Sequence, residues 1–78
     1  MQEPFVVDTG ALEKLNLTAR EYEVMQLMAK GYSNTEIADA LFLSLSTIKT
    51  HASNLFVKMD VSSRTKAIEK AKRLKITP

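Results

Sequence analysis

The stretch SLSTIKTHASNLF, residues 44–56, is rich in side chains that can form hydrogen bonds. Five of its thirteen residues carry hydroxyl groups, which are mediocre helix formers because they compete for backbone hydrogen bonds. Its apolar residues nevertheless recur with the spacing of one helix face. The opposite, outward face is then made of Ser46, Lys49, Thr50, Ser53, Asn54 and Val57. This combination indicates that the outward side chains serve to contact another molecule and not to stabilise the helix.

The chemistry of this outward face fits recognition of DNA bases. Short polar side chains let a helix enter the major groove, because larger ones would hold its backbone away from the base edges. Asn can pair bidentately with adenine, Lys donates to O6 and N7 of guanine, and Ser or Thr can bond a base or touch a thymine methyl group. A hydroxyl-rich face also occurs on ordinary solvated helices. The arrangement of the neighbouring helices is needed to distinguish a DNA-reading helix from an ordinary solvated one.

A helix over about residues 45–59 would position these side chains. Its inward seam is predicted to consist of Leu45, Ile48, Ala52, Leu55, Phe56 and Met59. These positions follow the 3.6-residue period, which overrides the weak helix propensity of the hydroxyl residues. The spacing therefore predicts a long amphipathic helix with its polar face in solvent.

Two capping boxes predict the helices that come before it. The sequences TARE at 18–21 and SNTE at 33–36 each place a capping hydroxyl three residues before a Glu. The first opens a helix to about Lys30, followed by Gly31, and the second opens a short helix to about Leu41. A short helix, a three-residue connection and a longer helix follow the helix-turn-helix order. In that motif the start of the short helix holds a phosphate, which would involve Ser33, Asn34 and Thr35.

The two ends of the chain are less regular. Residues 1–16 contain Pro4, Gly10 and the apolar patch at 5–7, and are predicted to be a linker or N-terminal arm lying against the core. Near the C-terminus, Ser62 or Ser63 would cap a fourth helix, whose buried face is Ala67, Ile68, Ala71 and Leu74. No strand pattern or repeat is present. The predicted fold is all-α, with four helices in a domain spanning residues 17–76.

Charge is distributed unevenly along the chain. Residues 1–43 hold three cations and seven anions, a net charge of −4, whereas residues 44–78 hold eight cations and two anions, a net charge of +6. Between Asp39 and Asp60 there is no carboxylate. A solvated face usually mixes both signs, so this stretch indicates a polyanionic partner.

Composition argues against several other functions. Without Cys and with His51 as the only His, the sequence offers no metal-ligand set, no cofactor motif and no catalytic constellation, so an enzyme is not expected. No apolar run is long enough to span a membrane, and no signal peptide is recognisable, so a cytoplasmic location is expected. A helical protein-interaction module remains an alternative, although its usual exposed aromatic or Leu cluster is missing from the outward face of the third helix.

Five fragments in order also carry a family resemblance. They are LTARE at 17–21, GYSNTEIA at 31–38, SLSTIKTH at 44–51, Leu55 with Lys58-Met59, and RTKA at 64–67. Together they resemble the LuxR-type helix-turn-helix domain, the output domain of many bacterial response regulators and quorum-sensing regulators. The resemblance covers roughly residues 17–76. It implies a four-helix DNA-binding domain whose third helix reads the major groove and whose fourth helix commonly makes the dimer contact.

The resemblance also implies roles for individual residues. Base contacts are expected at Lys49, Thr50, Ser53 and Asn54, although relatives often carry a larger or charged residue at position 53. Phosphate contacts are expected at Ser33, Asn34, Thr35, Ser46, Thr47 and Lys58. A dimer interface is expected at Thr65, Ile68, Glu69 and Lys72. Glu21 and Arg64 are expected to form an ion pair between the first and fourth helices.

The expected partners follow from the same resemblance. They are double-stranded DNA, a second copy of the chain, RNA polymerase, and an N-terminal receiver or ligand-binding domain outside this sequence. The promoter-reading fourth region of a sigma factor shares the Leu-Thr-x-Arg-Glu opening and is an alternative. The Lys49-Thr50-His51 run and the Arg64-x-x-Ala67 ending favour the LuxR type.

Overall fold

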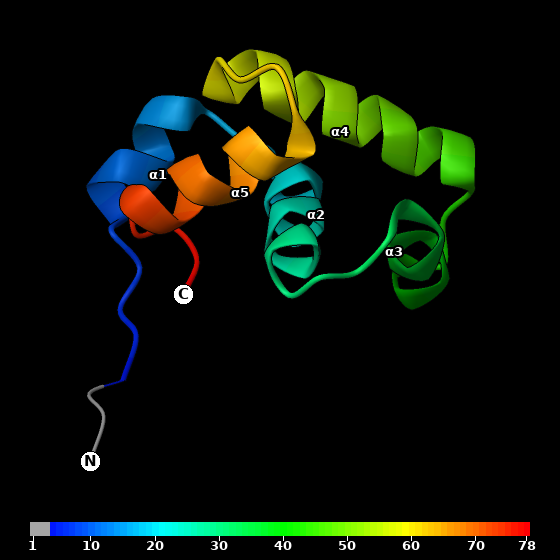
Figure 1. The fold of residues 1–78 in the computed structure, drawn as a ribbon, viewed down its shortest axis with the longest axis horizontal. Helices are drawn as coiled ribbons and strands as arrows, with labels where there is room; N and C mark the ends of the chain where they lie inside the picture. Colours follow the sequence, from blue (N-terminus) through cyan, green and yellow to red (C-terminus); the bar gives the residue numbers. More distant parts are fainter. Residues whose placement is uncertain (1–3) are drawn as a thin grey trace.

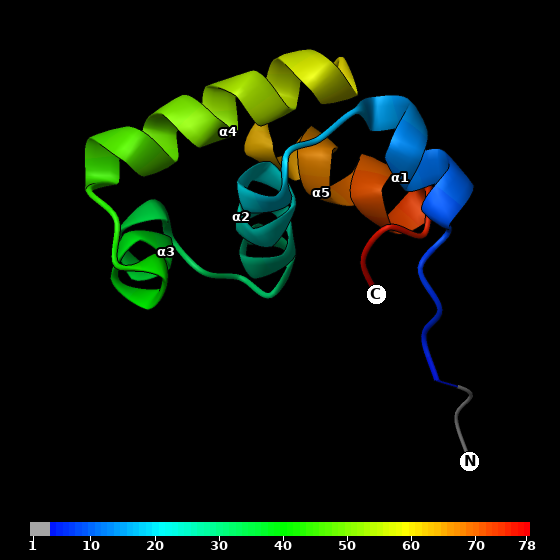
Figure 2. The ribbon, with the colours of Figure 1, turned by 180° about the vertical axis from the view of Figure 1, so that it is seen from behind.

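The computed structural model describes residues 4–78, and this part of the chain forms five α-helices and no β-strand. The helices are α1 (Thr9–Leu15), α2 (Ala19–Ala29), α3 (Asn34–Leu41), α4 (Leu45–Met59) and α5 (Arg64–Arg73). Helix α4 runs along one edge of the molecule, and the other helices lie on one side of it in both views (Figures 1 and 2). The all-α prediction is confirmed, with one more helix than expected.

Helices α2 and α3 begin as their capping boxes predict. The Thr18 hydroxyl accepts from the Glu21 N–H at 3.1 Å, and Glu21 Oε1 accepts from the Thr18 N–H at 2.9 Å. Ser33 and Glu36 make the same reciprocal pair at 3.1 and 3.0 Å. Gly31 forms the turn after α2 with a φ of +94°, a backbone conformation that residues with a Cβ rarely adopt.

The core is the junction of α2, α3, α4 and α5. From α4 it takes Ile48, Ala52, Leu55 and Met59, all of them buried. Phe56 is half-buried, and Leu45 is 40% exposed, so the prediction that Leu45 anchors the seam is wrong. The reason is its place in the first turn of α4, where it lines a surface hollow beside the start of α3 and not the core.

The additional helix, α1, takes up seven residues of the segment predicted to be an arm, residues 1–16. The Asp8 carboxylate caps it by accepting from the Ala11 N–H at 3.0 Å. Ala11, Leu12 and Leu15 pack against the core, and the Asp8 N–H donates to the Lys75 carbonyl at 2.9 Å. The apolar patch expected to lie on the core instead leaves Phe5 43% and Val6 76% exposed. Helix α1 lies beside the C-terminal end of α5 (Figure 1).

Three side chains, Lys58, Tyr22 and Arg64, make polar contacts between segments far apart in the sequence. Lys58 Nζ of α4 lies 2.6 Å from Glu21 Oε1 of α2, and the Tyr22 hydroxyl donates to the Ile76 carbonyl at 2.9 Å. The Arg64 guanidinium instead donates to Asn34 Oδ1 and to the Tyr32 carbonyl. The expected Glu21–Arg64 ion pair is therefore wrong, because α4 brings Lys58 to Glu21 and the start of α5 faces the loop before α3.

Helix α5 packs through small residues. Its buried Ala67 and Ala71 let it lie closely against the core, and Ser63 caps its first turn. Lys70 Nζ donates to the Met59 carbonyl at 2.6 Å, which places a cation at the negative C-terminal end of α4. None of the helices in residues 4–78 is long and apolar enough to cross a bilayer.

Candidate nucleic-acid interface

The four predicted base-contacting side chains lie on the side of α4 that faces away from the core. Lys49, Thr50, Ser53 and Asn54 are all exposed. This placement follows from the buried seam, because side chains opposite a helix's apolar stripe have to face solvent. The Thr50 hydroxyl donates to the Ser46 carbonyl at 3.1 Å, one turn back along α4. These side chains therefore form one continuous polar surface that a groove could accept.

A cluster of hydroxyl groups surrounds the start of α4. Ser44 Oγ accepts from the Thr47 N–H at 3.1 Å and lies 2.8 Å from Thr47 Oγ1 and 3.2 Å from Ser46 Oγ. Ser46 is exposed and Thr47 is half-buried. The helix dipole places partial positive charge at this end, so the two predicted phosphate contacts lie where an anion is favoured.

The start of α3 lies beside the start of α4. Ser33 and Thr35 are exposed there, and Asn34 is half-buried. A hollow between the two helix starts is lined by Gly31, Tyr32, Ser33, Asn34, Thr35, Leu45, Lys49 and Arg64. The structure thus brings the predicted phosphate contacts of α3 together with the predicted base contact Lys49. The sequence analysis missed Arg64 in this group, although a cation at the first position of a helix is a signal that it could have used.

Lys58 lies apart from this group. Its ammonium is paired with Glu21, whose side chain is only 5% exposed. Burial alone would raise the pKa of Glu21, but hydrogen bonds from Lys58 and from the Thr18 backbone outweigh it and hold the pKa below its usual value. A phosphate contact at Lys58 stays a prediction, and it would compete with this ion pair.

Electrostatics reinforce the geometry. All of α4 lies within the carboxylate-free stretch between Asp39 and Asp60. Lys49 and Arg64 both line the hollow at the start of α3, and the carboxylate of Glu36 is turned back onto the Ser33 N–H. That hydrogen bonding lowers the pKa of Glu36 below its usual value. The surface formed by the starts of α3 and α4 therefore presents cations, hydroxyls and amide groups.

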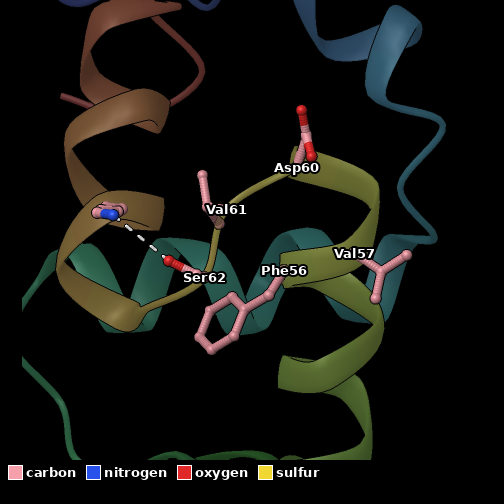
Figure 3. A pocket seen from close by; sticks show the side chains of 6 residues that line it. Phe56, Val57, Asp60, Val61 and Ser62 are labelled. Atoms are coloured by element: carbon pink, nitrogen blue, oxygen red, sulfur yellow. Dashed lines mark hydrogen bonds between the residues drawn. The ribbon is translucent and has the colours of Figure 1, made fainter.

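A second hollow lies at the other end of α4 (Figure 3). It is lined by Phe56, Val57, Asp60, Val61, Ser62 and Lys66. Val57 is 80% exposed and extends the outward face of α4 by one turn, and Lys66 Nζ donates to Ser62 Oγ at 3.4 Å. This hollow holds none of the predicted site residues.

Comparison with known proteins identifies the family to which this helical domain belongs. The family model GerE, described as bacterial regulatory proteins of the luxR family, matches residues 15–71, well over half of the chain. The chain belongs to this luxR family. The predicted LuxR-type resemblance is confirmed.

Individual relatives support the same assignment. The chain is 52% identical over 52 residues to the response regulator protein VraR of Staphylococcus aureus (strain NCTC 8325 / PS 47) and, equally, to that of Staphylococcus epidermidis (strain ATCC 35984). The match covers 67% of this chain but 25% of each relative, so the chain spans about a quarter of their length. A solved structure of the transcription factor GerE superimposes with a TM-score of 0.73 at 39% identity, covering 80% of this chain and 92% of that one. The luxR-family chain is a DNA-binding domain for transcription regulation and not an enzyme.

In this luxR-family domain, the predicted dimer residues all lie on α5. Thr65, Glu69 and Lys72 are exposed, and Ile68 is half-buried against the core. The exposed part of this set is polar, with one anion and one cation.

Proposed function

We propose that this domain binds double-stranded DNA sequence-specifically, with α4 in the major groove. The observation that carries the proposal is the outward face of α4. Four exposed side chains that can recognise bases stand on it, and no carboxylate interrupts the helix. The Lys49 ammonium can donate to guanine, and Asn54 has the amide that can pair with adenine. Thr50 and Ser53 complete the reading surface.

Phosphates flanking the groove would bind at the starts of α3 and α4. Ser33, Asn34 and Thr35 lie at one helix start, and Ser46 and Thr47 lie at the other. Their hydroxyl and amide groups, with the positive ends of two helix dipoles, suit a negatively charged backbone. Such contacts fix the register of α4 without reading sequence themselves.

Two copies would bind together through α5. Exposed Thr65, Glu69 and Lys72 with half-buried Ile68 offer a small, mostly polar contact surface. This composition suits an interface that is completed on DNA, where both copies are held in place by their half-sites. Dimeric helix-turn-helix proteins place their half-sites about one helical turn apart, or a multiple of it.

The larger setting is also a proposal. The relatives named response regulator are about four times as long as the matched segment. We infer that this domain is the output part of a cytoplasmic bacterial regulator that contains a receiver or ligand-binding domain and acts on RNA polymerase at promoters.

Replacement of Lys49 tests the proposed reading face. A cognate duplex is first selected from a random pool, and binding is then followed by fluorescence anisotropy. Lys49→Ala should weaken specific binding by about 1 to 3 kcal/mol and relax the preference at one base pair. The protein-to-duplex stoichiometry and the spacing of selected half-sites report whether two copies bind.

Lys14→Ala is the matched control, since it removes the same charge from α1, beside the far end of α5. It should leave the affinity nearly unchanged. Wild-type affinity and preference in Lys49→Ala, or failure of the pool to yield any preferred sequence, would reject the proposed role of α4.

A further inference from the structure

Arg64 links the start of α5 to the loop that leads into α3. Its Nη1 donates to Asn34 Oδ1 at 3.3 Å, and its Nη2 donates to the backbone carbonyl of Tyr32. These partners lie 30 and 32 residues away in sequence. The Arg64 side chain therefore makes two hydrogen bonds to the segment that contains the predicted phosphate contacts of α3.

The other hydrogen bonds of the loop between α2 and α3 are short-range in sequence: the Gly31 N–H donates to the Met28 carbonyl at 2.9 Å, and Ser33 pairs with Glu36 in its capping box. Gly31 turns the chain in the left-handed region, and nothing lies within 4 Å of the position that a Cβ would occupy there. Tyr32 and Ser33 are exposed, although the Tyr32 N–H still donates to the Leu27 carbonyl at 3.1 Å. The guanidinium is suited to fixing this segment, because its planar set of donors can bond two acceptors at once, whereas an ammonium acts as a point charge.

The contact also sets the orientation of the Asn34 amide. Since Oδ1 accepts from Arg64, the amide Nδ2 is left as a donor at the start of α3. A donor in that place can add a hydrogen bond to an anion held by the helix start. The same hollow contains Lys49, so the phosphate segment and the reading face meet where Arg64 acts.

We propose that Arg64 is a positioning residue for DNA binding, which arranges Ser33, Asn34 and Thr35 before a phosphate arrives. This inference rests on the proposed function. Ordering the segment in the free protein removes an entropy cost that would otherwise fall on binding. Arg64 acts through Asn34 and the Tyr32 carbonyl and does not itself bind the phosphate.

Salt dependence separates positioning from direct phosphate contact. Each phosphate that a protein cation neutralises steepens the dependence of log K on log salt by about 0.9. A direct contact predicts that Arg64→Gln reduces this slope by about 1 and that Arg64→Lys restores both slope and affinity. Positioning predicts an unchanged slope and no rescue by Lys.

The experiment compares Arg64→Gln, Arg64→Lys, Asn34→Ala and the Arg64→Gln/Asn34→Ala double variant on the selected duplex between 50 and 200 mM salt, a range of about fourfold. Lys66→Gln is the matched control, because it removes the same charge two residues further along α5 from an exposed side chain whose ammonium donates to Ser62 Oγ and which lines the hollow at the other end of α4. Circular dichroism confirms that each variant is folded at the assay temperature. Arg64→Lys and Asn34→Ala carry the test if Arg64→Gln does not fold.

We expect both Arg64 variants to bind about 3- to 10-fold more weakly, with the wild-type salt slope, in line with the net contribution of one ordinary hydrogen bond. The affinity of the double variant should lie within about twofold of the affinity of the weaker-binding single variant, because the two residues act through one contact. A slope reduced by about 1 with rescue by Lys would overturn positioning in favour of direct contact. Unchanged affinity in Arg64→Gln would also overturn it.

A second measurement needs no DNA. The heteronuclear NOE of the Ser33, Asn34 and Thr35 amides reports picosecond-to-nanosecond motion in the free protein. It should fall in Arg64→Gln and Asn34→Ala and stay unchanged in Lys66→Gln. If the wild-type chain showed no sequence preference, the proposed function would fail while this result still decided whether Arg64 orders the segment. An unchanged NOE would reject the ordering role.

Discussion

Phe42 combines two unfavourable features at one residue. It ends α3 in the left-handed region, with φ of 57° and ψ of 41°, and its side chain is 94% exposed. The left-handed conformation costs an L-residue roughly 1 to 2 kcal/mol, and helix ends of this kind usually carry Gly or Asn. Asn16 and Asp60, the caps of α1 and α4, are of the types that tolerate it. The exposed ring at position 42 gains no burial in compensation.

Phe42→Gly should therefore stabilise the domain. Relief of the left-handed strain, less the greater freedom of Gly in the unfolded chain, predicts a gain of about 0.5 to 1 kcal/mol. For a domain of this size that corresponds to a rise in Tm of roughly 3 to 6 °C, measurable by thermal circular dichroism. Phe42→Ala is the control, since it removes the ring but keeps the strain. Equal gains in both variants would show that the ring and not the backbone is unfavourable.

Residue exposure was easier to predict than residue partners. The 3.6-residue period alone placed Lys49, Thr50, Ser53 and Asn54 on the outward face, because a buried seam dictates what faces solvent. The partner of Glu21 could not be read in this way. It depends on how α4 and α5 rotate against α2, and periodicity within one helix carries no information on that rotation. Lys58 reaches Glu21, and Arg64 reaches the α2–α3 loop.

At the scale of elements, the helices that begin with a hydroxyl cap were predictable from the sequence, and α1 at the N-terminal end was not. Helices α2 and α3 begin directly after their predicted caps, and α4 begins at the predicted residue 45, because a hydroxyl cap is a local signal. Helix α1 has the weaker signal of an Asp8 cap and three apolar residues at 11, 12 and 15. Pro4 and Gly10 obscured it. A Gly near a helix start is tolerated when the neighbouring side chains are buried by tertiary contacts.

Removal of residues 1–16 tests whether α1 belongs to the domain that was predicted to begin at residue 17. Loss of the half-buried Ala11, Leu12 and Leu15 should lower the free energy of unfolding by about 2 to 3 kcal/mol, seen as a lower urea midpoint. DNA affinity should change little, because α1 lies beside the end of α5 and away from the start of α4 (Figure 2). Leu12→Ala/Leu15→Ala in the full chain should reproduce most of the loss. An unchanged midpoint would place the domain boundary after α1.

At the scale of the whole molecule, one carboxylate of the acidic half is buried while the others in residues 4–78 are exposed. Glu21 of α2 is the buried one, and it pairs with the half-buried Lys58 of α4. This ion pair joins residues 37 positions apart, and it leaves no buried side-chain polar atom without a partner in residues 4–78. A buried carboxylate of this kind makes the packing of α2 against α4 depend on its ionisation.

Acid should therefore loosen the fold through Glu21. Its pKa in the folded state lies below that of a free glutamate, so the carboxylate contributes its full stability above the ordinary glutamate pKa and loses it as the pH falls through the lower folded-state pKa. The free energy of unfolding, measured by urea titration from pH 7 to pH 3, should fall in this acidic window. Glu21→Gln should lose about 1 to 2 kcal/mol at pH 7 and show a flatter pH profile, because the variant no longer binds that proton on unfolding.

Glu23→Gln removes the same charge from an exposed position on α2, where Arg20 lies 3.2 Å away, and should keep the wild-type profile. If Glu21→Gln kept the full acid dependence, other carboxylates would have to carry it, with the capping residue Glu36 the first to replace, since its pKa is also lowered.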